Sequence, residues 1–230
     1  MNKELLIFGA DGALGSGVTK VFSSKEYNKI HLFDFKFKDN KKVEKINKYV
    51  IKDLAIEENV KNAFANVKPD KFTTFFLFST VGGFAGGNKI WETGIDEWEK
   101  MMRMNLTSSY LLAKHFALLV KNSNSGSICF TTAYTGLNPE VGKSAYGTSK
   151  SALIHFVKTL AEEGKAIKLS ANAIAPYIID TPANRSWMKD ADYDSWMKPD
   201  EIAQIIHSIF NCHYFVSGNI ITLKHRFSVT

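Results

Sequence analysis

Short runs of apolar residues alternate along the chain with segments that have helical spacing. The apolar runs are predicted strands, at residues 3–8, 30–34, 49–51, 72–78, 127–132, 169–175 and 219–223. The segments with apolar residues three or four positions apart are predicted helices, at residues 14–24, 56–67, 97–120, 145–163 and 201–212. Buried strands that alternate with helices indicate an α/β protein with a parallel sheet covered on both faces. The pattern predicts a Rossmann fold, with a doubly wound seven-stranded sheet.

One domain over residues 1–230 accounts for this pattern, because the length suits one substantial core and no linker or repeat interrupts it. The exception to the alternation is a long irregular stretch at about residues 177–198. Long loops in compact domains are usually functional, and this one follows the carboxyl end of a strand, where ligands bind in such folds. It is the predicted substrate loop.

The composition limits the function classes. The net charge is +6, but the lysines are dispersed, so we expect no nucleic-acid partner. No apolar run reaches the roughly 18 residues of a membrane span, and no cleavage site follows the first apolar run, so we expect a cytoplasmic protein that does not enter membranes. The two cysteines, Cys129 and Cys212, are too few for a disulfide scaffold, and we expect no metal site.

The first predicted strand runs into Gly9-Ala10-Asp11-Gly12-Ala13-Leu14-Gly15, which opens the first predicted helix. Glycines allow a tight turn and a close approach of the backbone, and a helix N-terminus attracts phosphate. This placement predicts a dinucleotide pyrophosphate site, although a plain tight turn is the alternative. The cofactor-binding residues predicted here are Gly9, Asp11, Gly12, Ala13, Leu14 and Gly15.

Asp34 ends the second predicted strand, where a carboxylate can accept hydrogen bonds from ribose hydroxyls and repel a 2′-phosphate. NADH is therefore the expected cofactor, and NADPH is possible but less favoured, because Lys36 and Lys38 lie close by. Asp53, after the third strand, is predicted to contact the adenine or to cap the helix that starts near Ile56. The cofactor-binding residues predicted in this part are Asp34, Phe35, Asp53 and Leu54.

Tyr146 and Lys150 lie four residues apart at the start of a predicted helix, so they share one of its faces. A neighbouring ammonium favours the phenolate, and we therefore expect Lys150 to lower the pKa of Tyr146. A phenol tuned in this way can act as a proton donor near neutral pH. The pair is the predicted catalytic centre, and both residues are also predicted to contact the cofactor.

Together, Tyr146-x-x-x-Lys150 and Gly9-x-x-x-Ala13-x-Gly15 resemble the short-chain dehydrogenase/reductase family over nearly the whole chain. The resemblance implies that Asn105 is catalytic and holds a water in a proton relay. It also implies that the backbone near Ile179 and the Thr181 hydroxyl bind the nicotinamide carboxamide. Two segments depart from the family pattern: Ser79-Thr80-Val81-Gly82-Gly83 replaces Asn-Asn-Ala-Gly, and Ala133 replaces the catalytic serine. The cofactor residues that the resemblance adds are Val81, Gly82, Gly83, Pro176, Ile179 and Thr181.

Two further segments are similar to those of one branch of this family, the dihydropteridine reductases: Val81-Gly82-Gly83-Phe84-Ala85-Gly86-Gly87-Asn88 and Asp180-Thr181-Pro182-Ala183-Asn184-Arg185. The resemblance implies that NADH reduces a quinonoid 6,7-dihydropteridine to the tetrahydropteridine, which regenerates tetrahydrobiopterin. A carbonyl or alcohol oxidoreductase is the alternative. The predicted pterin-site residues are Phe84, Ala133, Tyr146, Tyr177 and Trp196, although lid or core packing is an equal alternative for the aromatic ones.

Three further expectations complete the sequence-based picture. The missing serine leaves open whether Thr131 or Thr132 replaces its hydroxyl. Trp187 and Met188 are expected to pack in the lid rather than to contact substrate. A homodimer is expected, because the helices at 97–120 and 145–163 pair across a two-fold axis in the family. These helices also carry apolar residues that are not all expected to face one sheet: Leu111, Leu112, Phe116 and Leu119.

Overall fold

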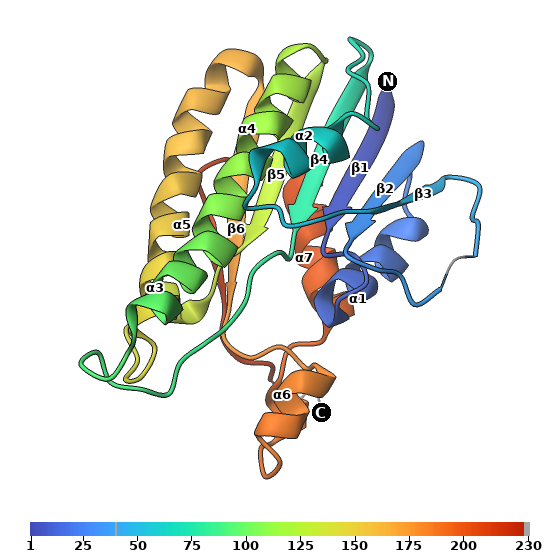
Figure 1. The fold of residues 1–230 in the computed structure, drawn as a ribbon. Helices are drawn as coiled ribbons and strands as arrows, with labels where there is room; N and C mark the ends of the chain where they lie inside the picture. The colour runs from blue at the N-terminus through green and yellow to red at the C-terminus, as the bar shows by residue number, and fades with distance from the viewer. Residues whose placement is uncertain (40, 228–230) are drawn as a thin grey trace.

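The computed structural model describes residues 1–39 and 41–227 and contains one seven-stranded sheet between two layers of helices (Figure 1). All neighbouring strands are parallel, in the order β3-β2-β1-β4-β5-β6-β7. The predicted Rossmann fold is confirmed. The strands are β1 (Asn2–Phe8), β2 (Lys29–Asp34), β3 (Ile46–Val50), β4 (Thr73–Ser79), β5 (Ser125–Thr131), β6 (Leu169–Pro176) and β7 (Ile220–Leu223).

The helices bury one hydrophobic core on each face of the sheet. On one face, α1 (Ala13–Ser23) and α7 (Pro199–Asn211) pack together over β1 and β4. The other face is covered by α2 (Glu57–Phe64), α4 (Ser108–Lys121) and α5 (Ser144–Gly164). The shorter helical pieces are α3 (Ile95–Met101), α6 (Pro182–Trp187), η1 (Met102–Thr107), η2 (Tyr134–Gly136), η3 (Lys165–Ile167) and η4 (Tyr193–Ser195).

Three predicted elements differ most from the observed ones, whereas the ends of the others shift by no more than three residues. The predicted helix at 97–120 starts earlier, at Ile95, and is interrupted by the π-helical turn η1, which apolar spacing does not reveal. The third strand is β3, at Ile46–Val50 rather than 49–51, because this edge strand is only partly buried and alternates with polar residues. The stretch at 177–198 is not irregular, since it contains α6, η4 and a bridge between Ile179 and Met197.

The apolar residues of α4 also lie differently from the expectation. The four residues that were expected not to fit one sheet are all buried within the single chain, between the sheet and the neighbouring helices: Leu111, Leu112, Phe116 and Leu119. These four residues therefore give no support to a dimer, which stays a prediction. The apolar side chains that α4 leaves exposed are Tyr110 and Leu118.

The strand order reverses between β1 and β4, because the chain moves outward through β2 and β3 and then returns to the other side of β1. Ligands of open α/β sheets bind at the carboxyl ends of the strands at such a switch point. One contact links this edge to the far end of the loop at 177–198: a Cβ added at Gly17 of α1 would lie 2.3 Å from Cβ of Pro199, the first residue of α7. Helix α1 therefore rests directly on the start of α7.

Candidate active site

The loops after β1 and β4 are tied together at the switch point. The Thr80 amide donates to the Phe8 carbonyl at 3.0 Å, and the Thr80 hydroxyl donates to the Gly9 carbonyl at 3.0 Å. Gly9 has a φ of 78°, and a Cβ there would lie 2.2 Å from Thr80 Oγ1. A Cβ at Gly15 would lie 1.9 Å from the Gly9 carbonyl oxygen. Both positions require glycine, and the loop has the predicted place between β1 and α1.

The N-terminus of α1 has the character of an anion site. Its N-cap is Gly12, which offers no side chain to the amide groups of the first turn. These N–H groups have no acceptor within the helix and lie at the positive end of its dipole. Gly12 and Ala13 are exposed, whereas Leu14 and Gly15 are buried, so Leu14 can offer only its backbone to a phosphate. The residues present fit a dinucleotide pyrophosphate.

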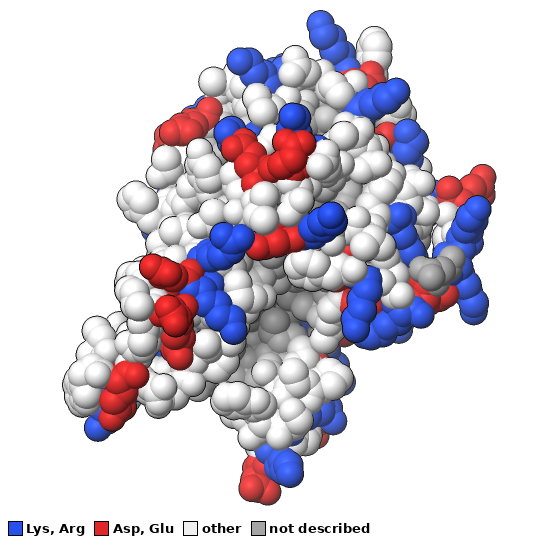
Figure 2. Space-filling model, in the orientation of Figure 1, with Lys and Arg blue, Asp and Glu red and all other residues white. Residues whose placement is uncertain are grey.

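Asp34, at the carboxyl end of β2, lies beside this loop. Its carboxylate accepts hydrogen bonds from the amide of Asp11 at 2.8 Å and from the amide of Phe35 at 2.7 Å. Phe35 itself is exposed. The Lys38 ammonium lies 3.9 Å from the Asp11 carboxylate, and basic side chains gather over the segment that joins β2 and β3 (Figure 2). The predicted ribose acceptor and Lys38, one of the two lysines that could soften its preference, thus border the same loop.

The structure gives Asp53 and Leu54 partners within the protein. One carboxylate oxygen of Asp53 accepts a hydrogen bond from the Ala55 amide at 2.8 Å, and the other pairs with Arg103 Nη2 at 2.6 Å. The Arg103 guanidinium, together with the Ala55 amide, lowers the pKa of Asp53. Asp53 shapes the turn before α2, which is close to the capping role left open, and Leu54 is buried in the core.

Tyr146 and Lys150 both lie on α5, as predicted, with the Lys150 ammonium 5.9 Å from the centroid of the Tyr146 ring. Lys150 is only 4% exposed and donates a hydrogen bond to the Thr131 carbonyl, at the end of β5, at 2.9 Å. A Cβ added at Gly82 would lie 3.1 Å from the same ammonium. The loop after β4 and the end of β5 therefore converge on this lysine.

Burial governs the acidity of both groups. It lowers the pKa of Lys150 to about 8. It raises the pKa of Tyr146 to about 12, with a smaller contribution from the negative charge of Glu140. The pKa of Tyr146 is therefore raised in this structure and not lowered as expected, because desolvation of the buried phenol is the largest influence on it. Tyr146 keeps its proton at neutral pH and is an acid there, while most of Lys150 carries its charge.

Asn105 is fully buried in the π-helical turn η1 and binds the loop after β4. Its side-chain oxygen accepts a hydrogen bond from the Gly83 amide at 2.9 Å, and its side-chain nitrogen donates to the Gly83 carbonyl at 3.1 Å and to Ser149 Oγ at 3.0 Å. Ser149 in turn donates to the Tyr146 carbonyl at 2.7 Å. The amide thus joins the glycine loop to the helix that carries the tyrosine, and the predicted water contact of Asn105 stays a prediction.

Ala133 follows β5 and is buried. The two neighbouring threonine hydroxyls donate hydrogen bonds to carbonyls of adjacent strands. Thr131 donates to the Ser79 carbonyl at 2.9 Å, and Thr132 donates to the Ile174 carbonyl at 2.8 Å. A hydroxyl that donates to a strand carbonyl has no second proton for a substrate oxygen. In this structure neither threonine hydroxyl therefore has a proton free for a substrate oxygen.

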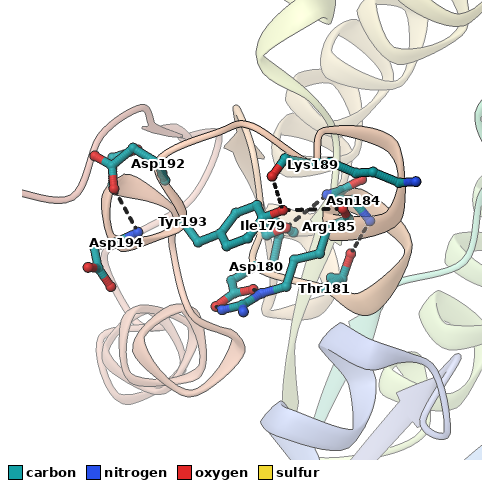
Figure 3. Close-up of polar contacts among 10 residues, drawn as sticks. Ile179, Asp180, Thr181, Asn184, Arg185, Lys189, Asp192, Tyr193 and Asp194 are labelled. Carbon is teal, nitrogen blue, oxygen red and sulfur yellow. Dashed lines mark hydrogen bonds and ion pairs between the residues drawn. The ribbon is translucent and has the colours of Figure 1, made fainter.

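The loop at 177–198 is held by polar contacts around α6 (Figure 3). Thr181 is the N-cap of α6, and its hydroxyl accepts a hydrogen bond from the Asn184 amide at 3.2 Å. The Asn184 side chain donates to the Ile179 carbonyl at 2.8 Å. These contacts place Thr181 and Ile179 directly after Pro176 and β6, beside the other strand ends, while both groups that were assigned to the carboxamide bind within the loop.

The predicted aromatic residues of the pterin site lie in three settings. Phe84 meets the Tyr146 ring edge to face, with centroids 5.0 Å apart, so it lies beside the predicted proton donor. Tyr177 is exposed and meets the Tyr134 ring at 5.3 Å, directly after β6. Trp196 is only 4% exposed and packs against Tyr193, so it has the packing role that was left open as its alternative.

Sequence reasoning missed several residues that build the site. Ser149 could have been noticed, because it precedes Lys150 and lies one turn after Tyr146. Arg103 gave no signal, since its partner Asp53 is 50 residues away. The contact of Tyr134 with Tyr177 likewise depends on how the ends of β5 and β6 are placed in the sheet.

The described residues, 1–39 and 41–227, contain no group of three or more His, Cys, Asp or Glu side chains arranged to hold a metal ion. They also contain no helix that combines the length and the apolar character needed to cross a bilayer.

The switch-point glycine loop and the tyrosine–lysine pair define the class: a Rossmann-fold oxidoreductase. The profile of the family described as short chain dehydrogenase matches residues 3–192. The chain is 32% identical over 206 residues to a dihydropteridine reductase of Dictyostelium discoideum, which covers 89% of this chain and 86% of that protein. This chain belongs to the short-chain dehydrogenase family.

Solved structures share the fold. ElxO with bound NADP matches with a TM-score of 0.86 at 21% identity, over 97% of this chain and 98% of that one. A 3-oxoacyl-(acyl-carrier protein) reductase with bound NAD from Brucella melitensis matches with a TM-score of 0.81 at 21% identity, over 96% of this chain and 89% of that one. At this identity the similarity concerns the fold, and the substrate has to be argued from the site.

Proposed function

We propose that this chain is a cytoplasmic, NADH-dependent reductase that converts quinonoid 6,7-dihydropteridines to tetrahydropteridines. The observation that carries the proposal is the surrounding of the proton donor: Ala133 stands where the family has a serine, and the hydroxyls of Thr131 and Thr132 donate to strand carbonyls. A ketone needs a donor that polarises its oxygen. A quinonoid pterin is already electron-poor and needs only a proton on a ring nitrogen, which Tyr146 can supply.

Two similarities support the pterin as substrate. The relative from Dictyostelium discoideum, at 32% identity over most of both chains, is named a dihydropteridine reductase. The segment from Val81 to Asn88 resembles the glycine-rich segment of those enzymes, and in this chain it brings Phe84 against Tyr146. An aromatic side chain beside the proton donor suits a flat heterocyclic substrate.

The residues that would hold the cofactor fit a nicotinamide dinucleotide. The glycine loop and the free amides of α1 suit a pyrophosphate, and two structural neighbours carry NADP and NAD. Asp34 supports NADH over NADPH, because its carboxylate would repel a 2′-phosphate. When bound, the reduced nicotinamide supplies the hydride.

The chain's own residues supply the proton and the alignment. Tyr146 holds a proton on its hydroxyl and delivers it to the substrate nitrogen. Lys150, buried and mostly charged at neutral pH, stabilises the phenolate that this transfer leaves behind. Asn105 and Ser149 hold the glycine loop against α5, so that Phe84 and Tyr146 keep their relative placement.

A carbonyl reductase is the second candidate, because one structural neighbour is named a 3-oxoacyl-(acyl-carrier protein) reductase. Steady-state oxidation of NADH and NADPH with a quinonoid dihydropterin generated in situ, compared with a panel of ketones, separates the two. We expect turnover of the pterin with NADH as the preferred cofactor. Turnover confined to ketones would refute the pterin proposal and support the second candidate.

We also propose that the protein acts as a homodimer through α4 and α5. Tyr110 and Leu118 of α4 are about half exposed, at 49% and 52%, and the Tyr110 ring meets Phe156 of α5 at 5.8 Å. These apolar side chains form an exposed surface across both helices that a second copy would cover. Sedimentation equilibrium of the wild-type protein and of the Leu118→Glu variant tests this, and a monomeric wild type would refute it.

A further inference from the structure

Trp187, on α6, is exposed where packing was expected. Its side chain is 76% exposed, and its indole meets the Phe84 ring edge to face, with centroids 5.9 Å apart and planes at 80°. Phe84 meets Tyr146 in the same way, at 5.0 Å and 81°. A row of aromatic rings therefore runs from the proton donor on α5, through the loop after β4, to α6.

Side-chain contacts hold the short helix α6 in place. A helix of six residues has little stability by itself. Arg185 makes two hydrogen bonds to the Asp180 carboxylate, at 2.6 and 2.8 Å, and its guanidinium lies 4.5 Å from the centroid of the Tyr193 ring. The Tyr193 hydroxyl donates to the Lys189 carbonyl at 2.9 Å (Figure 3). Trp187 therefore lies on a segment that is held by side-chain contacts.

A second indole of equal exposure, that of Trp91, provides a contrast. Trp91 is also 76% exposed, but the group over its ring is the Lys89 ammonium, 5.3 Å from the centroid. It lies on the loop between β4 and α3, whereas Trp187 contacts an aromatic ring that itself touches the proton donor. Exposure is therefore equal, and only the aromatic row distinguishes the two tryptophans.

We propose that Trp187 is a substrate-binding residue, whose indole covers a flat heteroaromatic ring held next to Phe84 and Tyr146. The face of the molecule is hollowed between α6 and the body of the domain (Figure 2), and Trp187 leaves most of its surface free for a ligand. Stacking against an indole favours a planar heterocycle over an aliphatic substrate. The inference rests on the proposed function, since a pterin ring is the planar substrate in question.

Kinetics of three variants test the assignment. Trp187→Ala is expected to raise the KM for quinonoid dihydropterin about tenfold, in line with the loss of one stacked ring, and to leave the KM for NADH unchanged. Trp187→Phe keeps an aromatic ring and is expected to raise that KM by no more than about threefold. Trp91→Ala, which removes an indole of equal exposure, is the matched control and should resemble the wild type.

Equilibrium dialysis with oxidised biopterin gives a readout that does not depend on turnover, and Trp187→Ala is expected to weaken its binding by a similar factor. If the wild type reduces pterins and Trp187→Ala has the KM and the biopterin affinity of the wild type, the role of Trp187 is refuted while the proposed function stands. A wild type that does not reduce pterins refutes the proposed function and the inference with it. Equal losses in Trp187→Ala and Trp91→Ala also refute the specific role.

Discussion

The proposed dinucleotide half and the proposed substrate half of this site are built in different ways. In the first, the chain between Gly9 and Gly15 packs so closely that an added Cβ would lie within 2.2 Å of a neighbouring atom at either end. In the second, α6 is held by side-chain contacts such as the pair of Asp180 and Arg185. A backbone-built site tolerates little change, whereas a side-chain-built site can be altered residue by residue. The difference suits a common cofactor and a variable substrate.

The largest effect on activity is expected at Tyr146, between the dinucleotide half and the substrate half. Tyr146→Phe removes the proton that the substrate receives, and we expect kcat to fall about 10²- to 10⁴-fold. The phenyl ring still packs against Phe84, so the affinity for NADH should stay within about twofold. Stopped-flow kinetics and fluorescence titration of NADH measure the two quantities. A variant with wild-type kcat would remove Tyr146 from the mechanism.

The dinucleotide half should respond sharply to a single methyl group. Gly15→Ala places a Cβ 1.9 Å from the Gly9 carbonyl oxygen, and overpacking of this kind costs about 2–3 kcal/mol. We expect a lower free energy of unfolding, measured by urea denaturation, and a loss of NADH affinity. Gly94→Ala is the matched control, because a Cβ there meets no atom within 4 Å. Equal stability of the two variants would contradict the packing argument.

The preference for NADH over NADPH tests whether a single side chain can change cofactor selectivity in the dinucleotide half. Asp34→Asn removes the charge that would repel a 2′-phosphate, and we expect the ratio of kcat/KM for NADPH to that for NADH to rise about tenfold. Lys38→Ala, which removes a cation beside the same loop, should move the ratio in the opposite direction. An unchanged ratio in Asp34→Asn would place the selectivity elsewhere.

The pH profile reports on the buried lysine. Its pKa, lowered by burial to about 8, means that the ammonium is charged below pH 8 and loses its proton above it. Because the charged form stabilises the phenolate, we expect kcat/KM to be flat below pH 8 and to fall about tenfold per unit well above it. Lys150→Arg, whose side chain keeps its charge, should lack this descending limb in whatever activity it retains. A wild-type profile that stays flat to pH 10 would contradict the role.

The smallest effect is expected in the substrate loop. Thr181→Ala removes the cap of α6, a change worth about 1 kcal/mol locally, so the KM for the pterin should rise a few-fold. Thr181→Ser keeps the hydroxyl and should behave as the wild type. If Thr181→Ala instead raises the KM for NADH, the hydroxyl acts on the cofactor, as the family resemblance implies.

The two halves also differ in what could be predicted from the sequence. The strand-to-helix alternation, the glycine loop and the Tyr146–Lys150 pair are local patterns, and in the structure the alternation is present, the glycine loop lies between β1 and α1, and both residues of the pair lie on α5. The pKa of Tyr146 was predicted in the wrong direction, because burial depends on elements that are far apart in the sequence. The side-chain contacts that hold α6 and the exposure of Trp187 were missed for the same reason, because the spacing of apolar residues does not indicate contacts between loops.

The contact between Gly17 and Pro199 bears on how the substrate loop could be exchanged between related proteins. The segment that we propose shapes the substrate side begins after Pro176, the last residue of β6, and ends at Pro199, which rests on α1. Both junctions are fixed by the scaffold rather than by the segment itself. Because Trp187 and Tyr177 of this stretch contact Phe84 and Tyr134 outside it, a graft between relatives is expected to transfer substrate preference only when these partner residues are transferred with it.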